Sequence, residues 1–299
     1  MTLADAIHPD PTLSPSSAGV QRKPRPAAPN VDYCAPKGDP GLFGPESVAW
    51  RVHANPVGLA VGGIAAVILE LAEPRVRTGV WEHSTFRTDP LSRMRRTGDA
   101  TMITTYGPTA AAKARIAMVN RMHERVGGKT PEGQAYRATD PDILTWVHVT
   151  ASYGFLNGYL RFVNPALSRE DQDRYYAESQ QTGTGFGAVN GPRSVAEADD
   201  FIEDWRKRLA PHEIIGEFLQ IVSTTSPIGP LGRLLQPLVV EGALDILPPW
   251  ARAQLNLPSH PTRRAAALPM LRAMGRLAKP GATSIPAQAY QRMDRPLAR

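Results

Sequence analysis

The chain has little cysteine and none of the histidine spacings that build a chelated metal site. Cys34 is the single cysteine among 299 residues, so no disulfide can form within the chain. A reducing compartment fits this composition, and we expect a cytoplasmic location. The sequence contains no His-Glu-x-x-His, no cysteine cluster and no glutamate three residues before a histidine. These absences exclude the usual zinc sites and the carboxylate-bridged di-iron bundle.

A long hydrophobic run is also missing. The most apolar stretch, Val57 to Ala72, contains three glycines and Glu70 and stops at Glu73-Pro74. A bilayer span needs ~20 apolar residues. We therefore predict a buried helix here, no membrane span, and no secretory signal peptide at the N-terminus.

Aromatic residues are scarce, at 7%, and few of them interleave with basic residues. The net charge of +6 is concentrated at the C-terminal end, because residues 250–299 carry nine Lys or Arg against the single acid Asp294. A basic end can contact nucleic acid or anionic lipid. Without a base-stacking platform we favour solvated helix faces, and we expect no nucleic-acid partner.

The pattern along the chain divides it into three parts. Residues 1–44 are rich in Pro and Ser without apolar periodicity, which predicts an extended arm. Residues 45–280 read as one helical domain, and residues 281–299 as a basic tail. Strand signals are scarce, so the predicted fold class is all-α. Helices are expected near 48–52, 59–71, 110–126, 141–162, 196–209, 213–223, 231–243, 249–256 and 263–278, with one opened by Asp89-Pro90.

Two predicted helices carry an inward histidine. The helix from Ala110 to Val126, closed by Gly127-Gly128, has His123 on its apolar stripe. In the helix capped by Asp140-Pro141, His148 shares a face with Leu144 and Phe155. Each imidazole can be a core histidine satisfied by a hydrogen bond, or the axial ligand of a heme iron. Composition alone does not rank the two histidines.

Other polar residues have a structural and a functional interpretation. Arg93 and Thr97 are one helical turn apart, either as surface groups or as an inward pair that holds a propionate or bound oxygen. His83 lies near a helix entry, where a capping or supporting role is the default. The glycine-rich stretch Gly183 to Gly187 is expected to be a loop, because it lacks the frame of a dinucleotide site.

Many of these residues occur in an order that resembles a known family, over roughly Gly44 to Val189. The family includes the latex clearing proteins, or rubber oxygenases, and a fungal oxygenase of mycophenolic acid biosynthesis. The resemblance rests on Trp50-Arg51, Glu73-Pro74, His83-Ser84-Thr85-Phe86, Asp89-Pro90, Arg93, Thr97, Tyr106-Gly107, Met122-His123, Val126-Gly127-Gly128, Gly133, Tyr136-Arg137-Ala138, Asp140-Pro141, Trp146-Val147-His148 and Tyr175 to Glu178.

The resemblance implies an all-helical domain with globin-like packing around heme b. It implies that His123 is the proximal iron ligand and that Arg93 and Thr97 are the family's polar pair, with His83 and His148 at the cofactor. Latex clearing proteins carry a lysine where this chain has Arg96, and a permanently protonated guanidinium is a poor iron ligand. Glu73 replaces a histidine found in many relatives; it is either a supporting base or a charge at a helix end.

Two functions follow from the resemblance. The first is a heme-dependent oxygenase whose partners are O2 and a hydrophobic small molecule, with Arg93, Thr97 and Arg96 as catalytic candidates. The second is a non-enzymatic helical heme protein, a carrier or sensor. The sequence leaves open a homo-oligomer and does not identify the substrate.

Overall fold

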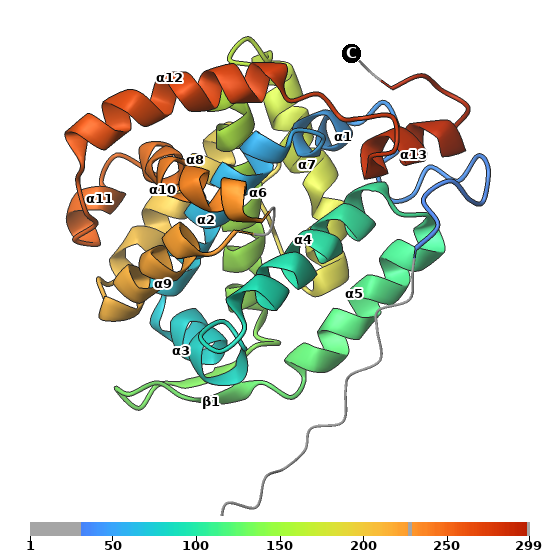
Figure 1. The fold of residues 1–299 in the computed structure, drawn as a ribbon. Helices are drawn as coiled ribbons and strands as arrows, with labels where there is room; N and C mark the ends of the chain where they lie inside the picture. Colours follow the sequence, from blue (N-terminus) through green and yellow to red (C-terminus); the bar gives the residue numbers. More distant parts are fainter. Residues whose placement is uncertain (1–30, 227–228, 298–299) are drawn as a thin grey trace, which may run out of the picture. The chain divides into compact units, whose positions relative to one another are not determined.

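The computed structural model describes residues 31–226 and 229–297, so most of the predicted arm lies outside the described residues. The described unit is mostly helical, as predicted (Figure 1). Its elements are α1 (Val48–His53), α2 (Pro56–Ala72), α3 (Pro74–His83), α4 (Pro90–Tyr106), α5 (Thr109–His123), β1 (Gly127–Lys129), β2 (Ala135–Arg137), α6 (Pro141–Phe162), α7 (Arg169–Phe186), α8 (Val195–Trp205), a 3-10 turn (Arg206–Arg208), α9 (Glu213–Thr224), α10 (Pro230–Asp245), α11 (Ala251–Gln254), α12 (Pro261–Leu277) and α13 (Ile285–Arg292).

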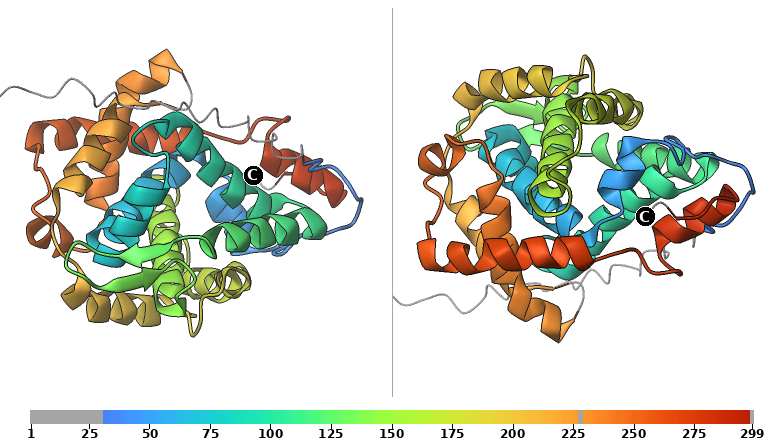
Figure 2. Two further views of the ribbon diagram at one scale, coloured as in Figure 1. Left: turned by 90° about the horizontal axis from the view of Figure 1, so that it is seen from below. Right: turned by 90° about the horizontal axis from the view of Figure 1, so that it is seen from above.

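Helices α2 and α6 form the centre of the core, and both views of Figure 2 show them inside the surrounding helices. Glycines face each other where they cross. A Cβ atom added at Gly62 would overlap the carbonyl oxygen of Gly154, and one added at Gly158 would lie 2.5 Å from the carbonyl oxygen of Gly58. The absence of side chains at these positions therefore lets the two backbones touch.

The helix starts follow the capping residues in the sequence. Asp89, Asp140 and Ser168 each accept a hydrogen bond from a backbone N–H of the first turn, which satisfies a donor that the helix leaves unpaired. Proline occupies the first position of both α4 and α6, as predicted. The helix starts predicted at Asp89-Pro90 and Asp140-Pro141 are thus confirmed, and Ser168 caps α7 in the same way.

The structure differs from the predicted helices at two places. The helix predicted to reach Val126 ends at His123, and Gly127–Lys129 pairs antiparallel with Ala135–Arg137 as a short hairpin. The predicted helices leave residues 72–88 without one, whereas the structure has helix α3 there. Its start is fixed by Glu73, which ends α2 and whose carboxylate accepts from the N–H of Val76 at 2.8 Å.

The glycine-rich stretch expected as a loop is instead the last turn of α7. Helix α7 continues to Phe186, and Gly187 closes it in the left-handed conformation. A Cβ atom at Gly183 would lie 2.7 Å from the imidazole of His148, and one at Gly185 would lie 3.0 Å from Ile116. Close packing of α5 and α6 against α7 thus offsets the cost of about 1 kcal/mol that each glycine adds to a helix.

The end of the described unit is tied to its beginning. Arg292 on α13, a helix that the sequence analysis did not predict, is fully buried. Its guanidinium donates to the carbonyl oxygens of Tyr33 at 2.8 Å, Asp39 at 2.7 Å and Tyr106 at 2.8 Å. These bonds join α13 to the turns of residues 31–44 and to the end of α4.

No single helix in the described ranges is long and apolar enough to cross a bilayer. Helices α2 and α3 reach that length and composition only as a pair, which is bent by 108°.

Candidate functional site

Three helices bring polar side chains toward one another beside the α2–α6 core. Arg93 on α4 acts electrostatically on Glu70 of α2 and on His123 of α5. Helices α4 and α5 lie side by side as a connected pair (Figures 1 and 2). The chain therefore places a carboxyl, a guanidinium and an imidazole in one electrostatic environment, although they are 53 residues apart from first to last.

His123 is the last residue of α5 and is half-buried. Its Nδ1 atom is buried and has no hydrogen-bond partner. Burial, and then the positive charge of Arg93, lower the pKa of His123 below its ordinary value. Both effects favour the neutral imidazole, which is the form that binds a metal.

Asn120 lies one helical turn before His123 and was not singled out from the sequence. Its amide donates to the carbonyl oxygen of Gly185 at 3.0 Å, which fixes α5 against α7. Its Oδ1 atom is buried without a partner, like Nδ1 of His123. Such atoms are rare in folded proteins, because each costs about 1–3 kcal/mol. Two such atoms lie within one turn of α5, which makes this face of the helix a candidate binding site.

Arg93 is half-buried and contacts Thr97 one turn later. Its guanidinium donates to the Thr97 hydroxyl, which in turn donates to the Arg93 carbonyl oxygen at 3.0 Å. Burial lowers the pKa of Arg93, and the charge of Glu70 opposes that change; the group stays protonated. Thr97 itself is exposed, so the expected inward pair is a half-buried arginine with a hydroxyl at its outer side.

Glu70 is a second functional candidate that the sequence analysis missed. Burial raises its pKa from 4.5 to about 7, against the opposing effects of Arg93 and of the Thr150 hydroxyl 3.5 Å away. A carboxyl with a pKa near neutrality can hold or release a proton at working pH. The signal was available, because Glu70 is the one charged residue between Val57 and Ala72.

His148 lies on the face of α6 that packs against α7. Its Nε2 atom is 3.3 Å from the Ser179 hydroxyl, and its ring packs against Gly183 of α7. Burial lowers its pKa to about 4, so the ring is neutral. Unlike His123, it has a polar partner and behaves as a core histidine.

Four titratable groups of this region are partly buried. Glu70, Arg93, His123 and His148 each keep part of their surface accessible, and burial is still the largest cause of the pKa shift in all four. Glu70, Arg93 and His123 are linked electrostatically, and we call these three residues the polar cluster.

Two further predicted site residues, His83 and Arg96, are exposed, although the charge of Arg96 contributes to the lowered pKa of Arg93. His83 is exposed, with Nε2 3.2 Å from the Tyr136 hydroxyl, which donates to Glu82 at 3.3 Å. Arg96 is exposed and donates to the Thr85 hydroxyl at 2.7 Å. No contact described in residues 31–226 and 229–297 joins either side chain to His123. Glu73 serves as the charge at a helix end.

The arrangement fits a heme better than a chelated ion. A heme brings four nitrogen donors of its own and needs one neutral imidazole from the protein, which His123 offers through a ring without hydrogen-bond partners in the described part of the chain. Arg93 supplies a guanidinium suited to a carboxylate such as a propionate. Within the described ranges, no group of three or more His, Cys, Asp or Glu residues could hold a metal ion.

Comparison with known families gives one match. The model of the family described as "ER-bound oxygenase mpaB/B'/Rubber oxygenase, catalytic domain" matches residues 50–279. Searches of curated proteins and of solved structures found no match.

Proposed function

We propose that the chain, which belongs to the ER-bound oxygenase mpaB/B'/rubber oxygenase catalytic-domain family, is an oxygenase that uses heme b and oxidises a hydrophobic small molecule. Family membership supports an oxygenase and therefore O2 and an organic substrate as partners. The observation that carries the heme proposal is the buried, unpartnered Nδ1 of His123 beside Arg93.

In this proposal each residue has a physical task. His123 holds the iron, because its depressed pKa keeps a lone pair available on the ring. Arg93 binds an anionic group of the cofactor from α4. The bound heme supplies the activation of O2, which protein side chains do not provide.

Glu70 is the residue of the polar cluster that can move a proton. Its pKa of about 7 allows the carboxyl to give a proton to, or take one from, an oxygen or carbon that reaches it. Arg93 limits how far that pKa rises, since its charge favours the carboxylate. The apolar core that packs against Met94 of α4 excludes water from its interior. The hydrophobic substrate of the proposal rests on the family name, because the rubber that it prints is itself apolar.

The visible spectrum of the purified protein tests the proposal. Protein produced with iron and heme precursor should show a Soret band, and its pyridine hemochrome should identify heme b. Colourless preparations are then mixed with hemin, because expression hosts can fail to load the cofactor. Protein that also fails to take up hemin contradicts the proposal.

Oxygen uptake separates the oxygenase from a heme carrier. Heme-loaded protein should consume O2 in the presence of an apolar alkene, and less without it. A protein that binds heme but shows no substrate-dependent uptake with a panel of apolar compounds would support the carrier or sensor instead.

A further inference from the structure

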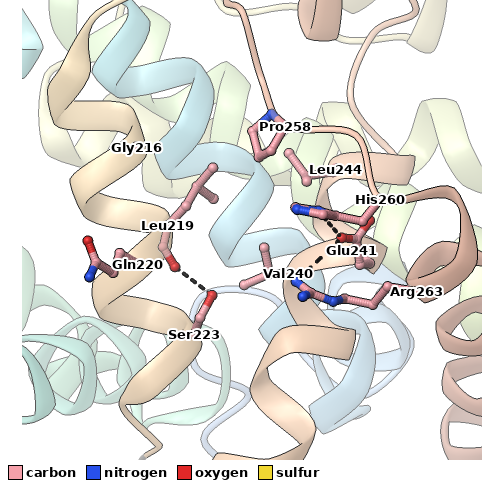
Figure 3. Close-up of a pocket in the computed structure, with 10 residues that line it drawn as sticks. All are labelled: Gly216, Leu219, Gln220, Ser223, Val240, Glu241, Leu244, Pro258, His260 and Arg263. Carbon is pink, nitrogen blue, oxygen red and sulfur yellow. Dashed lines mark hydrogen bonds and ion pairs between the residues drawn. The ribbon is translucent and has the colours of Figure 1, made fainter.

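A cavity lies between α9, α10 and the start of α12. None of the residues of the heme proposal line it. Its volume is about 210 Å³ (Figure 3). Leu219, Val240, Leu244 and Pro258 provide apolar walls. The remaining lining residues are Gly216, Gln220, Ser223, Glu241, His260 and Arg263. The cavity thus combines an apolar body with a small set of polar groups, as ligand sites do.

A buried carboxylate holds the two basic groups of this cavity. Glu241 is 1% exposed, and its Oε1 atom accepts a hydrogen bond from Nδ1 of His260 at 2.9 Å. The same oxygen lies 3.9 Å from the guanidinium of Arg263. Oε2 is buried without a hydrogen-bond partner. A buried carboxylate needs hydrogen-bond donors or positive partners, so Glu241 orients His260 and Arg263.

The free ends of both basic side chains extend into the cavity. Figure 3 shows the imidazole and the guanidinium reaching from the Glu241 side toward the space bounded by Leu219 and Val240. Their side chains are 42% and 47% exposed, so both remain accessible to a ligand. The guanidinium of Arg263 carries several N–H donors, of which Glu241 can use only some.

We propose that this cavity binds the carboxylate of a small molecule whose apolar part lies against Leu219, Val240 and Leu244. The guanidinium of Arg263 is complementary to a carboxylate, and the bonds that it donates to one are charge-assisted. An ammonium headgroup would face the charge of Arg263, and a neutral hydroxyl would gain less from it. The inference does not depend on the proposed heme function.

Isothermal titration of the full chain with three probes tests the site. Benzoate, benzyl alcohol and benzylamine share one apolar ring and differ in the charge of the headgroup. Benzoate should bind about tenfold more tightly than benzyl alcohol, and benzylamine should bind most weakly. Equal affinities, or tighter binding of either of the other two probes, would overturn the proposal.

Matched variants locate the bound anion. Arg263→Gln should weaken benzoate binding about tenfold, since it removes the charge and keeps a polar side chain. Arg264→Gln is the control: Arg264 pairs with Asp245, which keeps its partner Arg161, and does not line the cavity. Equal effects of the two substitutions would overturn the proposal.

Two further substitutions distinguish binding in this cavity from binding at the polar cluster. An added Cβ atom at Gly216 meets nothing within 4 Å, so Gly216→Met should fold normally and obstruct the cavity. Benzoate binding should fall in Gly216→Met and persist in Arg93→Gln. The reverse pattern would place the anion beside Arg93 and reject the cavity, whereas failure of the heme proposal would leave both results unchanged.

Discussion

The α2–α6 crossing and the α4–α5 pair are packed in opposite ways. At the crossing, glycines bring two backbones into contact, and α2 buries most of its length. Helix α5 buries only Ala112 and Ile116 among its 15 residues, and it carries two buried polar atoms without partners. The crossing holds the fold together, whereas α5 carries polar atoms that are buried but have no hydrogen-bond partner. Such atoms are rare in folded proteins, and in the heme proposal the cofactor would lie against this part of α5.

The largest effect should come from filling the crossing. Gly62→Ala places a methyl group on the carbonyl oxygen of Gly154. Because this oxygen belongs to the backbone, the clash can be relieved only if α2 and α6 move apart. We expect a loss of about 3–5 kcal/mol of unfolding free energy, measured by urea denaturation. The matched control is Gly98→Ala on α4, where an added Cβ meets nothing within 4 Å. It should stabilise by about 0.5–1 kcal/mol. Similar costs at the two positions would show that the two regions are packed alike.

The second prediction sets the two inward histidines against each other. His123→Ala should abolish heme retention, because its ring has no other task among the described contacts. His148→Ala should keep a Soret band, since His148 is held by Ser179 and packs on Gly183. Heme content per chain after gel filtration measures both. Loss of heme in the His148 variant alone would transfer the ligand role to α6.

The third prediction uses the pKa of Glu70. A pKa raised from 4.5 to about 7 contributes stability that is fully present below pH 4.5 and is lost as the pH rises through 7. Glu70→Gln has no proton to lose, so the heme-free variant should be more stable than the parent by about 2–3 kcal/mol at pH 8. At pH 4 the two should be equal. If the difference in unfolding free energy between Glu70→Gln and the parent stays constant from pH 4 to 8, Glu70 does not have the raised pKa.

The smallest expected effects concern Arg93 and Thr97 on α4. Arg93→Ala should weaken heme binding by about 1.5–3 kcal/mol, or ten- to a hundredfold, if its guanidinium pairs with a propionate. Thr97→Val removes a hydroxyl that bonds only to Arg93, so heme affinity should change by less than about 1 kcal/mol. Hemin titration measures both. A larger loss for Thr97→Val would mean that the hydroxyl, and not the guanidinium, contacts the cofactor.

Local signals in the sequence predicted most helices. Caps such as Asp89 and Asp140, each followed by proline, fix where a helix starts through neighbouring backbone groups alone. The same logic failed at Gly183, because the glycine there serves a contact with His148, 35 residues earlier, rather than a local turn. It also missed Glu70 as a site residue: the single charge in an apolar stretch was visible in the sequence, but the arginine that acts on it comes from another helix.

The sequence by itself determined the helical class, the caps, the family resemblance and the choice of His123 and Arg93 as candidates. These properties depend on residue type and on spacings of three or four along one helix. Only the tertiary structure decided which histidine keeps an unpartnered ring nitrogen, that Arg93 acts on Glu70, and that His83 contacts Tyr136 instead. Burial, pKa and pairing are set by atoms from distant segments, and no local pattern in the chain records which segments those are.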